Sequence, residues 1–154
     1  FQILVNNAAS FARGPVAELS TEDWDRVVET NLRATYLMCR YAAPHFTEGG
    51  GGDIINICST SGKKGDPGGS AYAASKFGMT GFSQSLFGEL RNSGVRVTTI
   101  FPSSVNTQER ELSATADRPE SLCSEDIGDA VVFSLLMPAG VTVKELELWN
   151  TKSK

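Results

Sequence analysis

The sequence predicts an α/β protein built on a parallel sheet, and two observations carry this prediction. Short runs rich in isoleucine and valine alternate with longer segments of helical periodicity, at intervals of about forty residues. Strand–helix–strand units of this length join parallel strands through right-handed crossovers. Apolar residues at consecutive positions are also typical of strands that helices cover on both faces. The order of elements therefore indicates one layered domain.

Four segments have the composition of strands. The first three have consecutive apolar residues, whereas the fourth alternates apolar and charged residues, which favours the edge of a sheet. The expected strands are FQILV (1–5), DIINIC (53–58), VRVTTIF (95–101) and VKELELW (143–149).

Three segments between these strands carry helix signals. A serine followed by threonine and acidic residues is a favourable helix start, and an Asn-Ser-Gly sequence is a common helix end. Proline stops a helix because it lacks a backbone N–H. The expected helices run from Ser20 to about Pro44, from after Ser70 to near 92–94, and over 125–137, before Pro138.

Composition narrows the class of protein. The chain has 154 residues and a formal net charge of −4, which gives no reason to expect a nucleic-acid partner or an anionic membrane surface. It contains no apolar run long enough to span a bilayer. Cys39, Cys58 and Cys123 are odd in number and far apart, which fits a reducing compartment better than a disulfide framework. We therefore expect a globular, cytoplasmic protein.

Ligands of parallel α/β sheets bind in the crevice at the carboxyl ends of the strands. Three groups of candidate residues follow the first three expected strands: Asn6–Ala9, Ser59 and Pro102–Thr107. We expect these segments to meet at one edge of the sheet.

Tyr72 and Lys76 stand four positions apart in the second expected helix and so share a face. An ammonium group near a phenol favours the phenolate and lowers the tyrosine pKa from its usual value near 10. Ser59 lies at the end of a strand, and the glycine-rich loop after it can bring its hydroxyl to Tyr72, where both could hold a carbonyl oxygen. Taken alone, the pair also fits a surface tyrosine and a solvated lysine.

Asn31 falls on the apolar stripe of the first expected helix, the face that should be buried. A buried amide needs hydrogen-bond partners. From this feature alone, a structural hydrogen bond to a neighbouring loop is the favoured interpretation.

Two other features do not indicate a ligand site. Gly49–Gly52 follow a helix and precede a strand, whereas a phosphate loop precedes a helix, so we interpret this run as a flexible connection. His45 is the single histidine of the chain and has no cluster of metal-ligating residues around it, so no metal site is predicted.

Together, five segments resemble the successive signatures of the short-chain dehydrogenase/reductase family. Their order and intervals fit across nearly the whole chain, although each signature alone is weak. They are VNNAAS (5–10), ETNL (29–32), INICSTSG (55–62), YAASK (72–76) and FPSSVNT (101–107).

The resemblance implies the C-terminal portion of a Rossmann-type doubly wound parallel sheet, strands four to seven by analogy. It implies hydride transfer between NADP or NAD, with NADP slightly favoured, and a carbonyl or alcohol substrate, with 3-oxoacyl thioesters as one possibility. Tyr72 would be the acid–base residue and Lys76 would lower its pKa and hold the nicotinamide ribose. Ser59 would position the substrate oxygen and Asn31 would anchor a water in a proton relay.

The resemblance also implies a cofactor groove and an oligomer. Asn6, Asn7 and Ala8 would line the adenosine side of the groove, while Pro102, Val105 and Thr107 would lie at its nicotinamide end beside Tyr72 and Lys76. Members of the family pair as homodimers or homotetramers through two long helices. Here the small residues of the second helix would allow close approach: Ala74, Gly78 and Gly81.

This sequence departs from the family pattern at three places. Ala9 and Ser103 replace glycines near the cofactor groove, which we interpret as tuning rather than loss of function. The Gly-rich first turn of the family is not found, so we expect residues 1–154 to be the catalytic portion of one domain that lacks about eighty N-terminal residues. The alternative is a non-catalytic fragment that serves as a structural or assembly module.

Overall fold

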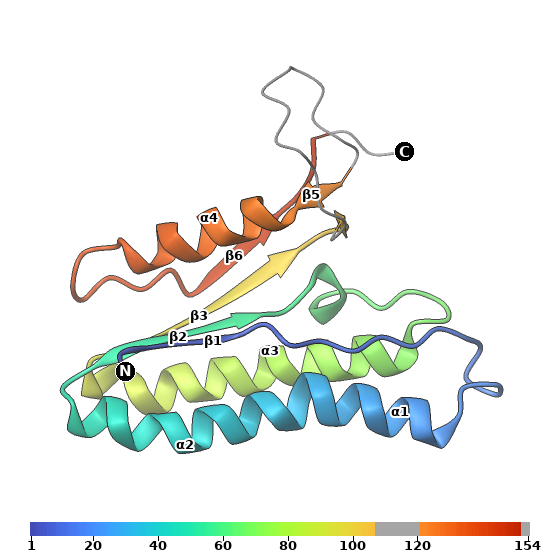
Figure 1. The fold of residues 1–154 in the computed structure, drawn as a ribbon, viewed down its shortest axis with the longest axis horizontal. Coiled ribbons are helices and arrows are strands. Elements are labelled where there is room, and N and C mark those ends of the chain that lie inside the picture. The colour runs from blue at the N-terminus through green and yellow to red at the C-terminus, as the bar shows by residue number, and fades with distance from the viewer. Residues whose placement is uncertain (107–120, 152–154) are drawn as a thin grey trace.

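A computed structural model of the chain describes residues 1–106 and 121–151. Its centre is a four-stranded sheet in which all neighbouring strands are parallel and follow the chain order β1-β2-β3-β6 (Figure 1). The strands are β1 (Ile3–Asn6), β2 (Gly52–Ile57), β3 (Val95–Pro102) and β6 (Glu145–Leu148). The predicted α/β class and parallel sheet are confirmed, and each strand lies within one residue or two of its expected bounds.

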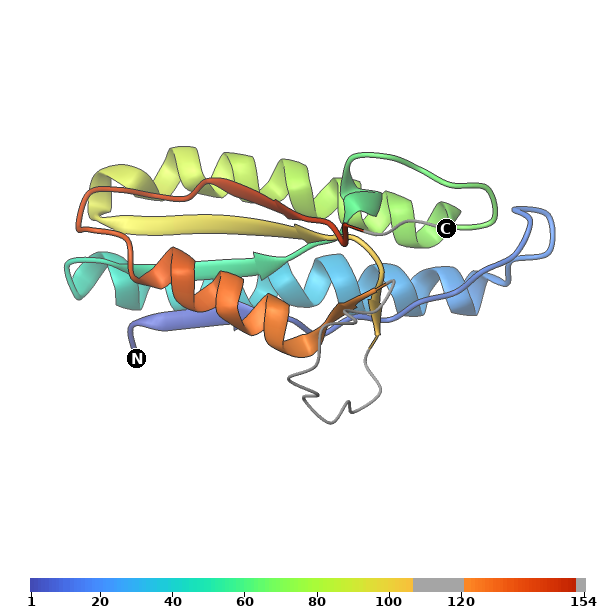
Figure 2. The ribbon, with the colours of Figure 1, turned by 90° about the horizontal axis from the view of Figure 1, so that it is seen from above.

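Helices cover the sheet on two sides. One layer contains α1 (Thr21–Val28), a π-helical turn η1 (Glu29–Arg33), α2 (Ala34–Glu48) and α3 (Ser70–Leu90), while α4 (Ser124–Leu135) lies on the opposite face (Figures 1 and 2). Short elements complete the described fold: the 3-10 turns η2 (Thr60–Gly62) and η3 (Arg91–Ser93), and a pair of two-residue strands, β4 (Val105–Asn106) and β5 (Leu122–Cys123).

The first long helix continues beyond Pro44, where the sequence predicted its end, and reaches Glu48. Proline removes the hydrogen bond that its N–H would give to the carbonyl of Arg40. Both residues are exposed, so water can satisfy that carbonyl, and the helix continues. A threonine in the next turn adds a local bond, because Thr47 Oγ1 donates to Pro44 O at 3.0 Å.

The core has two main layers, and one strand is covered on only one face. Apolar side chains of the sheet pack against α2 and α3 on one side and against α4 on the other. In β1, Leu4 and Asn6 are buried, but Ile3 and Val5 point to the other face and are 48% and 42% exposed. The expectation that helices cover both faces of every early strand is therefore wrong for β1.

The glycine run at 49–52 connects α2 to β2, where the chain passes close to another turn. Gly51 has a left-handed φ of 137°, and a Cβ on it would lie 2.8 Å from the carbonyl oxygen of Gly94. Larger residues do not fit this connection. Among the residues that the structure describes, no helix combines the length and apolar character needed to cross a bilayer.

Candidate active site

A cavity of about 760 Å³ opens at the carboxyl ends of β1, β2 and β3. Its wall is formed by the loops after these strands, the first turns of α3 and the first turns of α4. Nine of the residues singled out from the sequence line it: Asn7, Ala8, Ala9, Ser59, Tyr72, Lys76, Pro102, Ser103 and Val105. Parallel strands therefore bring together segments that are far apart in the sequence, as expected.

Tyr72 and Lys76 lie one turn apart at the start of α3, under the end of β2. Lys76 is 1% exposed and its Nζ donates to the carbonyl oxygen of Ile57 at 2.9 Å. The same Nζ lies 5.6 Å from the centre of the Tyr72 ring. On its other side, the Tyr72 ring meets Phe11 edge-on, with the ring centres 5.1 Å apart. The phenol is thus held between a buried ammonium and an aromatic wall from the loop after β1.

Burial sets the protonation of this pair. It raises the pKa of Tyr72 above its usual value, and the neighbouring Ser59 side chain only partly offsets the rise. Burial also lowers the pKa of Lys76. The expectation that Lys76 brings the Tyr72 pKa below its usual value is therefore wrong for this structure. The ammonium is directed to the Ile57 carbonyl, and desolvation of the phenol is the larger effect.

Ser59 is held by the backbone that follows β2. Its extended conformation makes it the N-cap of η2, and its Oγ accepts a hydrogen bond from the N–H of Ser61 at 3.1 Å. Ser59 also lines the cavity together with Tyr72. The loop after β2 and the helix α3 therefore each bring a hydroxyl-bearing side chain to the wall of the same cavity.

Asn31 occupies the π-helical turn η1 and is fully buried. Its Oδ1 accepts from Ser10 N at 2.6 Å, and its Nδ2 donates to Ser10 O at 2.9 Å and to Ser75 Oγ at 3.0 Å. The side-chain amide of Asn31 thus links the loop after β1 to Ser75 on α3, the residue that precedes Lys76 in the sequence. Asn31 does not line the cavity, and its role in a proton relay remains a prediction.

Asn6 does not line the cavity either, although it was expected to line the adenosine side of the groove with Asn7 and Ala8. The strand pleat turns it to the face covered by α2 and α3, where its Nδ2 donates to Asn56 Oδ1 at 2.8 Å. Asn56 in turn donates to Ser83 Oγ at 2.8 Å. Side chains of successive strand residues alternate between faces, so Asn6 and Asn7 cannot both face the groove.

The two positions where glycine is replaced cause no backbone strain. In the described parts of the chain, no residue other than glycine has a left-handed φ, so Ala9 and Ser103 adopt ordinary conformations. Both line the cavity. Gly78 has a different role from the one expected, because a Cβ there would lie 2.7 Å from Leu32 Cδ2 within the same chain. Thr107 lies outside the described residues.

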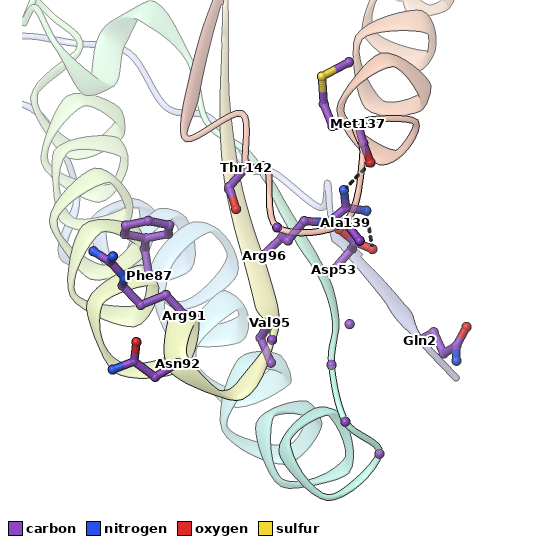
Figure 3. A pocket seen from close by; sticks show the side chains of 16 residues that line it. Gln2, Asp53, Phe87, Arg91, Asn92, Val95, Arg96, Met137, Ala139 and Thr142 are labelled. Atoms are coloured by element: carbon purple, nitrogen blue, oxygen red, sulfur yellow. Dashed lines mark hydrogen bonds and ion pairs between the residues drawn. The ribbon is translucent and has the colours of Figure 1, made fainter.

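A second hollow, of about 790 Å³, lies at the amino ends of the strands, the end of the sheet opposite the cavity at Tyr72. Figure 3 shows the side chains that line it. The guanidinium of Arg96 in its wall already has partners: Nε donates to Asp53 Oδ1 at 2.6 Å and Nη1 donates to Met137 O at 2.9 Å. The glycine run 49–52 forms part of its wall. This hollow is slightly larger, but its lining residues include no tyrosine–lysine pair like Tyr72 and Lys76. The cavity at Tyr72 is therefore the candidate active site.

The residues at the cavity fit a nicotinamide nucleotide. An ammonium carries three donors, and in the described structure Lys76 uses one of them, for Ile57, which leaves two for ribose hydroxyl groups. Small side chains at Ala8 and Ala9 leave space beside them. By contrast, the described residues contain no group of three histidine, cysteine, aspartate or glutamate side chains placed to hold a metal ion.

Comparison with known proteins agrees with this geometry. The model of the short chain dehydrogenase family matches residues 1–117. An uncharacterized oxidoreductase of Staphylococcus epidermidis is 32% identical over 146 residues, which are 95% of this chain and 63% of that protein. D-threitol dehydrogenase of Mycolicibacterium smegmatis is 42% identical over 106 residues, covering 69% of this chain and 41% of the enzyme.

Solved structures of dehydrogenases share the fold of this chain. The closed form of serine dehydrogenase complexed with NADP+ superposes with a TM-score of 0.88 at 32% identity, over 100% of this chain and 67% of that one. The chain spans about 63% of the length of the staphylococcal relative. With a family model that covers most of its residues, the chain belongs to the short-chain dehydrogenase/reductase family.

Proposed function

We propose that the protein to which this chain belongs transfers a hydride between NAD(P)H and a carbonyl or alcohol substrate. The observation that carries the proposal is the convergence of Ser59, Tyr72 and Lys76 at one cavity, in a chain of an oxidoreductase family. The nicotinamide ring, when bound, supplies or accepts the hydride.

Tyr72 moves the proton in this proposal. Like a free tyrosine, the phenol is protonated at neutral pH, and burial raises its pKa further, so it can donate its proton to the oxygen of a carbonyl as negative charge develops there. Ser59 holds the same oxygen with its hydroxyl. In the reverse direction, the phenolate form of Tyr72 takes the proton of the alcohol. A positive charge placed 5.6 Å from the ring centre assists by stabilising the phenolate that forms during reduction.

The cofactor is held by residues on both sides of the pair. Lys76 would bind the ribose hydroxyls through its two remaining donors, Asn7 and Ala8 would border the adenosine side, and Pro102 and Val105 would border the nicotinamide. Both NADP and NAD are candidates, and the serine dehydrogenase complex with NADP+ supports NADP.

The substrate class is a small hydroxy compound or its carbonyl form. The names of the relatives, which include a threitol and a serine dehydrogenase, support polar hydroxyl substrates. A 3-oxoacyl thioester remains a candidate on the sequence resemblance. The free thiols of Cys39 and Cys58 support a reducing cytoplasm.

Two exposed surfaces, one on β1 and one on α3, support proposals about the extent of the domain and about its oligomer. The uncovered face of β1 supports the view that residues 1–154 are the catalytic portion of a longer domain. Ala74 and Gly81 are exposed on α3, and a Cβ on Gly81 meets no atom within 4 Å. They support pairing of this helix in a homodimer or homotetramer.

The first test is a titration of the 154-residue chain with NADPH and with NADH, followed by the fluorescence of the cofactor and of Trp24 and Trp149. Saturable binding at micromolar concentration supports the proposal and identifies the cofactor. A folded chain that binds neither would mean that these residues keep the catalytic side chains without the cofactor site, and that the enzyme activity belongs only to the longer parent.

The second test uses the full-length parent enzyme. Tyr72→Phe should abolish reduction of carbonyl substrates while binding of the cofactor persists. Tyr41→Phe is the matched control, because this tyrosine is 69% exposed on α2 and lies outside the cavity. Equal activity of the two variants would refute the role of Tyr72.

A further inference from the structure

Lys63 ends the short turn that carries Ser59 and ties it to the edge strand of the sheet. It is the C-cap of η2, four residues after Ser59. Its Nζ lies 2.9 Å from Glu145 Oε2 and 2.7 Å from Glu147 Oε1, both on β6. One ammonium thus bridges two carboxylates that point to the same side of a strand more than eighty residues later in the chain.

Further contacts fix this bridge in place. The Nζ lies 4.2 Å from the centre of the Phe101 ring, which is fully buried at the end of β3. Each carboxylate has a second partner: Gln84 Nε2 donates to Glu145 at 3.2 Å and Trp149 Nε1 to Glu147 at 3.1 Å. The two glutamates raise the pKa of Lys63, so it stays charged at neutral pH. The cluster therefore belongs to a built network rather than to a single surface ion pair.

The opposite side of the turn is also held. Gly62 packs so closely on α3 that a Cβ there would lie 2.8 Å from Thr80 Oγ1 and 3.0 Å from Lys76 O. Within the turn, Ser59 Oγ accepts from Ser61 N. The serine is consequently joined to α3 on one side, and Lys63 supplies its connection to the sheet edge on the other.

We propose that Lys63 is a positioning residue for Ser59: its bridge to Glu145 and Glu147 holds η2 where Ser59 lines the cavity together with Tyr72. This inference rests on the proposed function, because Ser59 matters only if that site works on an oxygen of the substrate. It adds a role for the edge strand β6, which contributes no residue to the cavity lining. Loss of the bridge should free the turn and weaken the contact between Ser59 and Tyr72.

The test measures the titration of Tyr72 in the 154-residue chain by NMR of its ring carbon, without cofactor. Groups that face this phenol are Ser59, Lys76 and Cys58. Ser59 lowers the pKa of Tyr72, so the titration midpoint should rise in Ser59→Ala. Lys63→Met should shift the midpoint in the same direction, and adding it to Ser59→Ala should produce no further shift.

Lys64→Met is the matched control, because the neighbouring lysine is 82% exposed in a loose ion pair with Asp66 and should leave the midpoint unchanged. Lys63→Arg should restore the wild-type midpoint. The proposal is overturned if Lys63→Met leaves the Tyr72 midpoint and the Ser59 amide resonance unchanged, or if the Lys64 variant shifts them equally. A failure of Lys63→Arg to restore them would also overturn it, because a positive charge opposite Glu145 and Glu147 would then not be what holds the turn.

Should Lys63→Met fail to fold, Glu147→Gln weakens the same bridge at its exposed end and must shift the midpoint in the same direction. The measurement is independent of hydride transfer. A chain that shows the expected shifts, together with a parent enzyme whose activity survives Tyr72→Phe, would therefore refute the proposed function while leaving the positioning role of Lys63 intact.

Discussion

Replacing Gly62 with alanine tests how tightly the serine-bearing turn is seated on α3. The added Cβ would lie 2.6 Å from Cys58 Sγ, 2.8 Å from Thr80 Oγ1 and 3.0 Å from the backbone oxygen of Lys76. Overpacking of this kind costs about 1–3 kcal/mol. Reduced freedom of the unfolded chain returns about 0.4–1 kcal/mol, because Gly62 does not have a left-handed φ.

The free energy of unfolding of Gly62→Ala should therefore fall by about 1–2 kcal/mol. With an m-value of about 2 kcal/mol/M, the urea midpoint should fall by about 0.5–1 M. Gly88→Ala on the exposed side of α3 is the matched control, because its new Cβ meets no atom within 4 Å. That variant should gain about 0.5 kcal/mol from helix propensity. A Gly62→Ala midpoint at or above that of the wild type would refute the close seating of the turn.

Three further predictions concern buried polar groups. Because burial lowers the pKa of Lys76, the wild type should gain stability relative to Lys76→Met as the pH rises from 7 towards 10.5, and a constant difference in urea unfolding would contradict this. Asn31→Ala removes the amide bonds to Ser10 and Ser75 and should lower the free energy of unfolding by about 2–4 kcal/mol in the same assay, so a loss below about 1 kcal/mol would show that the amide is dispensable. Burial raises the pKa of the Cys39 thiol to about 11, so a disulfide reagent at pH 8 should modify this thiol only after unfolding. Mass analysis of peptides checks this prediction, and rapid modification of Cys39 in the native chain would contradict it.

The sequence predicts the sheet well because its signals are local. Consecutive β-branched residues define β2 and β3, and alternating charges place β6 at an edge, where Lys63 uses Glu145 and Glu147. The position of the site also follows, since parallel strands end at one edge. These features depend on residue order and period alone.

Other features depend on tertiary contacts that no local pattern contains. The π-helical turn at Glu29–Arg33 accompanies the bonds of Asn31 to a loop twenty-one residues earlier in the chain. The direction of Asn6 depends on the parity of the pleat, so an error of one residue in register reverses it. The pKa of Tyr72 depends on how deeply its ring is buried, which the spacing to Lys76 cannot show.

The contact between Asn6 and Asn56 has a consequence for the fidelity of folding. These residues are direct partners in the parallel register of β1 on β2, and their amides are bonded at 2.8 Å in an apolar layer. Because β1 pairs with only one neighbour in the described sheet, aliphatic contacts alone would tolerate sliding. A slip of one residue would turn Asn6 to the opposite face, and a slip of two would leave Asn56 without its donor, an alignment error costing about 1–3 kcal/mol. The hydrogen bond between Asn6 and Asn56 therefore fixes the register of β1 on β2. This register in turn places the loop that begins at Asn7 at the cavity.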